Sequence, residues 1–351
     1  MNESVTQKHF QLPTQSSWAH TWCQPSFTYL HSDHFNGEKF FNSVRRPADR
    51  NAHDLFKWLL SRKSQTWHVN TEEETQEFFS HPRLLPQERP NAELSDWQIW
   101  FIGHATVLIQ IGPYNFLTDP VWCEHVSPFS NMGPKRVIQA GIALEELPAI
   151  DAVLLSHNHY DHMDLATLEW LHIAFEMPIL TGLGNAWYLP KNYNVIELDW
   201  WQSEIFEDFK IVYTPAQHGS GRGVRDQNRA LWGGFSILTD QDHCFFAGDT
   251  GYSPHFKEIK MRLGAPRIAL LPIGAYEPRH LMQYMHMNPE DAFHAHQDLH
   301  AKCSMGIHYR TFQLTDEDRD QPEQHLHHVI RHSSKLINPF VCIREGRRLI
   351  I

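Results

Sequence analysis

The stretch that decides the fold is "LLSHNHYDHMD", residues 154–164, in which three histidines and two aspartates occupy the eight positions after Ser156. It overlaps the end of the apolar run "AVLLSH" at 152–157, which is typical of a strand buried on both faces. A buried strand end gains nothing from polar side chains, because each must be desolvated and then given a partner. We therefore expect this cluster to bind a ligand.

The cluster has the pattern H-x-H-x-D-H, formed by His157, His159, Asp161 and His162. Imidazole nitrogens and a carboxylate suit zinc or a similar metal. Residues two apart on an extended loop can converge on one ion, and the following Asp-His pair can serve a second ion nearby. An ordinary polar loop is the alternative, but four residues of ligand type in six positions favour a metal.

Three later apolar runs also end in a possible ligand, His218 in "YTPAQH", Asp249 in "FFAGDTG" and His308 in "SMGIHY". Each of these residues alone fits an ordinary loop as well. Together with the first cluster they complete two sets of ligands, and Asp249 is the carboxylate able to bridge both ions. Asp119, in "FLTDP", is expected to orient a ligand histidine without binding metal itself.

The character of the chain changes near residue 95. Residues 1–95 are irregular except for a helical pattern at 54–63, and we expect an extension that packs on the core. Residues 96–351 are expected to form one α/β domain, with helices at 164–175 and 288–300 that open with Asp164 and Asn288 as caps. Apolar runs predict strands at 97–103, 105–112, 114–120, 152–157, 178–182, 195–199, 209–216, 233–240, 243–250, 268–274, 302–308 and 339–345. Their order predicts two sheets packed face to face with helices outside.

Composition narrows the class of protein. The 351 residues carry a formal net charge of -11, which disfavours a nucleic-acid partner because phosphates require a basic footprint. The short basic pieces at 45–50 and 344–349 are expected to be solvated surface. The five cysteines form no CxxC pair, and the N-terminal residues contain no apolar signal core, so we expect a cytoplasmic protein.

The ligand pattern resembles that of the metallo-β-lactamase superfamily, whose fold is a four-layer αββα sandwich with a binuclear metal site along one edge. A narrower resemblance, to the N-acyl-phosphatidylethanolamine-hydrolysing phospholipase D family, extends from about residue 40 to about residue 345. It is carried by "WFIGHATVLIQI", "FLTDPVW", "MGPKR", "ELPAIDAVLLSHNHYDHMD", "VIELDWW", "YTPAQH", "FFAGDTGY", "PIGAYEPR" and "SMGIHYRTF". The resemblance makes residues 96–351 a hydrolase domain.

Carried over residue by residue, the resemblance assigns His157, His159 and His218 to one metal. It assigns Asp161, His162 and His308 to the other, with Asp249 as the bridge. It also implies that His286 lies near the reacting phosphate; a surface histidine before the Asn288 cap is the alternative.

The same resemblance shows where this chain departs from the family. Met285 stands where the family has Gln, Gly219 where it has Trp, and "IHYRTF" where it has "IHWGTF". Tyr276, Met282, Met285 and His286 are expected to border the substrate, because methionine-rich surfaces adapt to varied apolar ligands.

The function that the resemblance implies is a phosphodiesterase of phospholipase D type with two Zn²⁺ ions per chain, other divalent metals remaining open. It would hydrolyse N-acyl-phosphatidylethanolamine to N-acylethanolamine and phosphatidic acid, with Asp161, Asp249 and His286 as catalytic residues. The alternative is a related hydrolase of another phospholipid, a soluble phosphodiester or a lactone. An idle metal- or lipid-binding protein is disfavoured, since all seven ligand positions are filled.

The expected partner is therefore a phospholipid, reached by peripheral contact with a membrane surface through apolar side chains. A homodimer is possible. The stretch at 17–30 is expected either to cover the core or to face the membrane, and that at 280–287 to admit the lipid.

Overall fold

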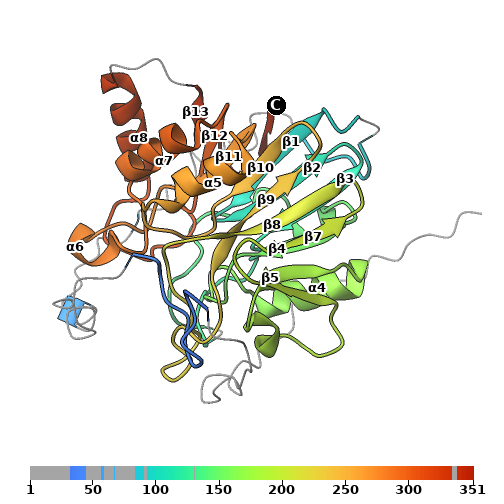
Figure 1. Cartoon of the computed structure of the whole chain (residues 1–351), viewed down its shortest axis with the longest axis horizontal. Helices are drawn as coiled ribbons and strands as arrows, with labels where there is room; N and C mark the ends of the chain where they lie inside the picture. The colour runs from blue at the N-terminus through green and yellow to red at the C-terminus, as the bar shows by residue number, and fades with distance from the viewer. Residues whose placement is uncertain are drawn as a thin grey trace, which may run out of the picture.

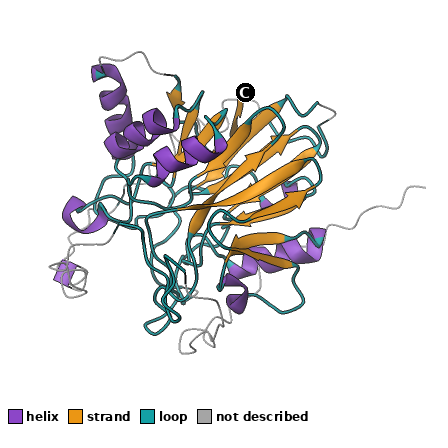
Figure 2. Cartoon of the chain, in the orientation of Figure 1, coloured by secondary structure: helices purple, strands orange, loops and turns teal. Residues whose placement is uncertain are grey.

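Two seven-stranded sheets lie face to face at the centre of the molecule, as the computed structural model shows (Figures 1 and 2). Helices cover both outer faces, with α5, α7 and α8 on one side and α4 on the other. The predicted αββα sandwich is confirmed. The structure describes residues 32–44, 57–58, 67, 84–90, 93–129, 131–333 and 338–351. The stretch at 17–30, and all of the predicted helix at 54–63 except residues 57 and 58, lie outside this part of the chain.

The first sheet has the order β14-β1-β2-β3-β4-β5-β6. Its neighbours from β14 to β3 pair antiparallel, and those from β3 to β6 pair parallel. The central strands are buried on both faces, as their continuous apolar sequences predict. The strands are β1 (Trp97–Gly103), β2 (Thr106–Ile111), β3 (Tyr114–Thr118), β4 (Ala152–Leu155), β5 (Ile179–Gly182), β6 (Val195–Leu198) and β14 (Arg347–Ile350).

The second sheet has the order β13-β12-β11-β10-β9-β8-β7. Here β7 to β10 pair antiparallel and β10 to β13 pair parallel, so each sheet combines a meander with a parallel half. The strands are β7 (Ser203–Phe206), β8 (Phe209–Pro215), β9 (Gly233–Leu238), β10 (His243–Phe246), β11 (Ile268–Pro272), β12 (Ser304–Ile307) and β13 (Phe340–Val341).

The two predicted helices are present with the expected N-caps. The Asp164 side chain accepts a hydrogen bond from the Ala166 N–H, and Asn288 forms a reciprocal capping box with Asp291. No helix in the described ranges is both long enough and apolar enough to span a bilayer. The helices are α4 (Leu165–Phe175), α5 (His255–Leu263), α6 (Arg279–Met282), α7 (Pro289–Leu299) and α8 (Gln321–His332), with 3-10 turns η1 (Leu144–Glu146) and η2 (Asn185–Tyr188).

The expectation that 344–349 is solvated basic surface is wrong for its second half. Residues 347–350 form β14, an edge strand that pairs with β1. Arg348 is half-buried, with its guanidinium 5.3 Å from the Trp100 ring and donating a hydrogen bond to Gln98. Arginine covers apolar surface with its stem while keeping its charge hydrated, so a basic sequence can still form a strand at an edge.

The apolar core is divided into two layers by the first sheet. One cluster, including Phe101, Phe116 and Phe235, lies between the two sheets and continues through the second sheet to α5 and α7. A second cluster, including Leu155 and Leu168, joins the outer face of the first sheet to α4. The loops that follow β1, β3, β4, β8, β10 and β12 carry polar residues at one edge of this sandwich, and the candidate site lies there.

Candidate metal centre

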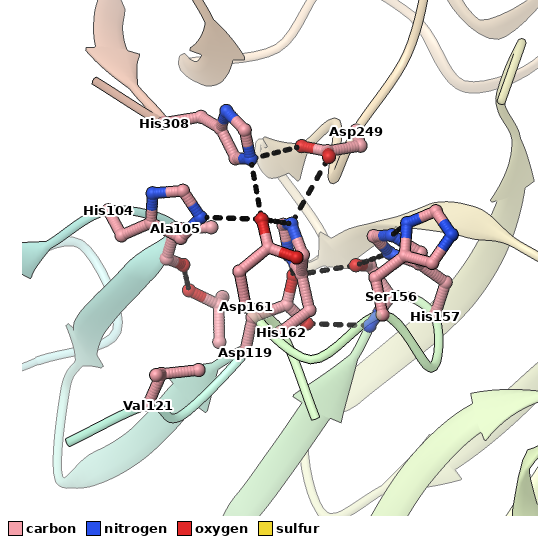
Figure 3. Close-up of polar contacts among 12 residues, drawn as sticks. His104, Ala105, Asp119, Val121, Ser156, His157, Asp161, His162, Asp249 and His308 are labelled. Carbon is pink, nitrogen blue, oxygen red and sulfur yellow. Dashed lines mark hydrogen bonds and ion pairs between the residues drawn. The ribbon is translucent and has the colours of Figure 1, made fainter. Parts of the chain in front are cut away.

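The seven predicted ligands lie together at one edge of the sandwich, although they come from both sheets. Figure 3 labels His157, Asp161, His162, Asp249 and His308 among them. Four of them follow β4 in the first sheet, and the others follow β8, β10 and β12 in the second. All seven lie in the loops that follow these largely buried strands, so the strand ends help to fix their positions. The residues are His157, His159, Asp161, His162, His218, Asp249 and His308.

The first set contains three imidazole rings whose nitrogens face one another. His157 Nε2 lies 2.8 Å from His159 Nδ1, and His218 Nε2 lies 3.2 Å from the same atom. Three ring nitrogens at this spacing suit one tetrahedral metal ion. The arrangement is the one expected for the first ion.

The second set combines two imidazoles with two carboxylates. Asp161 Oδ2 lies 3.3 Å from both His162 Nε2 and His308 Nε2. Asp249 lies between the two sets, with Oδ1 3.1 Å from His308 Nε2 and Oδ2 3.2 Å from His162 Nε2. The same Oδ2 is 3.7 Å from His218 Nε2, in the first set. Asp249 therefore occupies the place expected of a bridging carboxylate.

Asp119 is fully buried behind the ligands and supports one histidine in each set (Figure 3). Its Oδ2 accepts a hydrogen bond of 2.6 Å from His162 Nδ1 and another of 2.6 Å from the Ser156 hydroxyl. Ser156 in turn lies 2.9 Å from His157 Nδ1, which donates to the hydroxyl oxygen. Both rings therefore present Nε2 to the site, and Asp119 lies where it can orient them.

The electrostatics of the two sets differ in a way that suits cations. Burial lowers the pKa of His157 and His218 well below the ordinary histidine value, so their inner nitrogens carry lone pairs. Burial would raise the pKa of Asp249, but His162 and His308 hold it well below its usual range. Ionised buried carboxylates beside convergent lone pairs require positive charge between them. These residues therefore fit bound metal ions.

His104 is a further member of the centre that sequence reasoning did not single out. It follows β1 in a left-handed conformation with φ of 57°, is buried, and its Nε2 lies 3.0 Å from Asp161 Oδ2. Its ring centroid is 4.0 Å from that of His308. A histidine directly after an apolar strand is the same signal that identified His218 and His308. "WFIGHA" at 100–105 carries that signal, and Figure 3 shows the result.

His286 lies beside the metal ligands, as expected. Its Nδ1 is 3.8 Å from Asp249 Oδ2, and its ring centroid is 5.0 Å from that of His218. Burial lowers its pKa to about 4. Two groups on neighbouring elements hold the loop: Arg279 donates to the His286 carbonyl at 2.9 Å, and the same guanidinium pairs with Asp291 at 2.5 Å.

The other predicted substrate residues occupy different environments. Met285 is half-buried, and its carbonyl accepts a hydrogen bond of 2.9 Å from His218 Nδ1. Met282 and Met287 are buried, so the stretch 280–287 is not an open methionine surface. Tyr276 is also buried, and its ring faces His325 of α8, 6.2 Å away between centroids. Of the four, His286 and Met285 directly contact or border the metal ligands.

Comparison with known proteins agrees with this geometry. A family model described as the β-lactamase superfamily domain matches residues 114–309, more than half of the chain. N-acyl-phosphatidylethanolamine-hydrolyzing phospholipase D 1 of Caenorhabditis elegans is 36% identical over 236 residues, which cover 61% of this chain and 64% of that protein. The mitochondrial N-acyl-phosphatidylethanolamine-hydrolyzing phospholipase D of Saccharomyces cerevisiae is 37% identical over 256 residues, or 70% of this chain and 54% of that protein. The chain thus spans less than two thirds of the length of both relatives.

A solved structure shows the same fold. Igni18, described as a metallo hydrolase from the archaeon Ignicoccus hospitalis, superposes with a TM-score of 0.56 over 73% of this chain and 98% of its own, at 20% identity. The resemblance inferred from the motifs is confirmed. The chain belongs to the β-lactamase superfamily, as a metal-dependent hydrolase with N-acyl-phosphatidylethanolamine-hydrolysing phospholipases D among its homologues.

Proposed function

We propose that the protein is a binuclear zinc-dependent phosphodiesterase that hydrolyses N-acyl-phosphatidylethanolamine to N-acylethanolamine and phosphatidic acid. The observation that carries the proposal is the position of Asp249 between two complete ligand sets, with His286 facing the same carboxylate. The two phospholipase D relatives support the substrate class by their names and their identity to this chain.

The proposal assigns His157, His159 and His218 to one zinc ion. Asp161, His162 and His308 would hold the other, and Asp249 would bind both. When bound, such a pair of ions makes water acidic enough to act as a nucleophile at neutral pH and neutralises charge on phosphoryl oxygens.

The chain's own residues orient the reacting groups. Asp119 keeps the inner nitrogens of two ligands turned toward the site, which preserves the geometry through the reaction. His286 is neutral near pH 7, because burial lowers its pKa to about 4. A neutral imidazole at this position donates a hydrogen bond to a phosphoryl oxygen, so binding of the phosphate suits it better than protonation of the leaving alcohol.

The departures from the family pattern define the space around the substrate. A Cβ atom placed on Gly219 would lie 3.8 Å from Met285 Cε and 3.0 Å from the Asn228 side-chain oxygen. Met285 therefore borders the region that the family's Trp would occupy. Arg310, which replaces the family's Gly at a φ of 67°, pairs with Asp320, so its charge is directed at another side chain.

Access to a bilayer is part of the proposal. We propose that a cytoplasmic protein contacts the membrane surface peripherally, through apolar side chains near the site. Val224, in the loop that follows His218, is 75% exposed, and such a side chain can enter the interface between headgroups and acyl chains. The acidic composition gives no general attraction to anionic lipids.

The test is product analysis with zinc-loaded protein. Vesicles would contain N-acyl-phosphatidylethanolamine or plain phosphatidylethanolamine, and bis(p-nitrophenyl) phosphate would serve as a soluble phosphodiester. We expect N-acylethanolamine and phosphatidic acid from the first vesicles. Turnover of the soluble diester or of plain phosphatidylethanolamine, without N-acylethanolamine release, would replace this function by that of a related hydrolase. No turnover and no bound metal would exclude the metalloenzyme altogether.

A further inference from the structure

The N-terminal segment 32–44 lies across the sandwich close to the metal centre, although it precedes β1 by more than fifty residues. Phe35 and Phe40 are buried in the cluster between the sheets, with ring centroids 4.6 Å apart. The backbone N–H of Phe40 donates a 2.8 Å hydrogen bond to the carbonyl of Asn228, in the loop that follows His218. The segment is therefore part of the folded core.

Asn42, in this segment, contacts the backbone of His218 through both ends of its amide. Its Nδ2 donates to the His218 carbonyl at 2.7 Å, and its Oδ1 accepts from the His218 N–H at 3.0 Å. The same Oδ1 accepts a 3.0 Å hydrogen bond from the indole N–H of Trp232. One side chain thus satisfies both backbone groups of a residue that lies beyond the end of β8.

The physical need for this contact follows from the position of His218. The residue is buried, and buried backbone N–H and C=O groups require partners. Because the strand has already ended at Pro215, no neighbouring strand supplies them. The side chain of His218 is held as well: the Met285 carbonyl accepts a hydrogen bond from His218 Nδ1, which turns His218 Nε2 toward His159. Asn42 and Met285 together leave the ring one orientation.

We propose that Asn42 is a positioning residue of the metal centre, which fixes the backbone of His218 so that its Nε2 meets the ion held with His157 and His159. The inference rests on the assignment of His218 as a ligand under the proposed function. It extends the site beyond the family match, since the family model begins at residue 114 and Asn42 lies before it.

Several contacts hold Asn42 in place. The side chain of Gln217 donates to the Val44 carbonyl at 2.8 Å, on the far side of Asn42 from Phe40. Arg229 pairs with Glu38 at 2.6 Å, and His34 lies 2.7 Å from Asp199. These contacts join the segment to both sides of the loop that carries His218, so the amide is presented in a fixed position.

The test measures metal loss from the full chain. Asn42→Ala removes all three hydrogen bonds, and Asn36→Ala is the matched control. Asn36 caps a local turn in the same segment, where its side chain accepts from the N–H groups of Glu38 and Lys39 and from no described residue of the metal centre. Protein loaded with two zinc ions would be mixed with a chromophoric chelator, and the rates of release and kcat on bis(p-nitrophenyl) phosphate would be recorded.

We expect Asn42→Ala to release one of its two ions about 10-fold faster than the parent, with kcat lowered by a similar factor, because groups that orient ligands change metal affinity by this order. The second ion should leave at the parent rate. Asn36→Ala should release both ions as the parent does. Should Asn42→Ala fail to fold, Asn42→Ser, whose hydroxyl is too short to make both hydrogen bonds, is expected to give the same selective release.

Two results would overturn the inference. Equal acceleration of both ions would show general loosening of the fold, and release within twofold of the parent would show that Asn42 does not position His218. A parent protein that binds no metal would instead refute the proposed function, so the two failures are distinguishable.

Discussion

A single carboxylate, that of Asp119, controls the presentation of one ligand in each metal set. Three donors converge on it, the His162 Nδ1–H, the Ser156 hydroxyl and the Ser156 backbone N–H. Asp119 also acts indirectly on His157, because the Ser156 hydroxyl that donates to Asp119 accepts a hydrogen bond from His157 Nδ1. Under the proposed function, a residue outside the ligand set can therefore disturb both ions at once.

Replacement of Asp119 by Asn tests this arrangement. The amide keeps the size of the carboxylate but offers an N–H group where three donors already point, so at least one hydrogen bond is lost. We expect activity on a soluble phosphodiester to fall by roughly 10–100-fold while some metal is retained. Asp242→Asn, in the β9–β10 turn, is the control and should leave activity unchanged. Complete loss of both ions would place Asp119 among the ligands.

Asp249→Asn should be more damaging than the change at Asp119. The neutral amide removes the charge that both ion sets share, and with it the means of holding the two ions together. We predict a fall in kcat of more than ~100-fold and less than two zinc ions per chain by elemental analysis. Turnover close to that of the parent, with two ions bound, would show that the bridge is misplaced.

At the scale of residues, the ligands were predictable because each follows an apolar run that must be a buried strand. His104 carries the same signal but stands alone after Gly103, without a neighbouring ligand to draw attention to it. Asn42 could not be identified from the sequence. Its role depends on His218, which lies 176 residues further along the chain.

Among the elements, the segment 32–44 is also attached to the core through the side chain of His34. The ring stacks on Trp200 with centroids 4.3 Å apart and lies between Asp199 and Asp33, at 2.7 and 2.6 Å. Burial lowers the pKa of His34, but the hydrogen bonds and charges of the two aspartates outweigh it, so the pKa is raised above 6.5.

The raised pKa of His34 predicts that the free energy of unfolding depends on pH. Because the folded pKa is the higher one, the stabilisation by His34 is complete below pH 6.5 and is lost as pH rises through the folded pKa. The difference in unfolding free energy between the parent and His34→Gln should therefore shrink as pH increases above 6.5. Urea unfolding at a series of pH values measures it, and a difference that grows with pH would contradict the assignment.

Element prediction from the sequence failed mainly at edges and in histidine-rich helices. The strand β7 alternates exposed and half-buried residues at a sheet edge, and Ile205 within it is 67% exposed, so it lacks a continuous apolar run. In α8 only Pro322 and Leu326 are buried. The apolar positions Pro322, Leu326, Val329 and Ile330 do keep a helical spacing, but the histidine and charged residues between them make this repeat short.

For the molecule as a whole, both sheets contribute proposed ligands to the same candidate centre, so bound metal should stabilise the sandwich. A ligand that binds only the folded state at 1,000 times its dissociation constant adds about 4 kcal/mol. We predict that removing zinc with a chelator lowers the melting temperature by several degrees, and that zinc restores it. Asp249→Asn should show a smaller restoration. An unchanged melting temperature in calorimetry would mean that the ions do not join the sheets.

The gathering of ligands from both halves of the chain also determines when the centre can form. Asp161 and His308 are separated by 147 residues, and their side chains meet only after both sheets have folded and docked. Closing such long loops is slow, because the chain loses conformational entropy before the stabilising contacts form. Under the proposed function, high-affinity metal uptake is therefore a late step of folding. On the same basis, the metal content of a preparation reports the fraction of molecules that have completed folding.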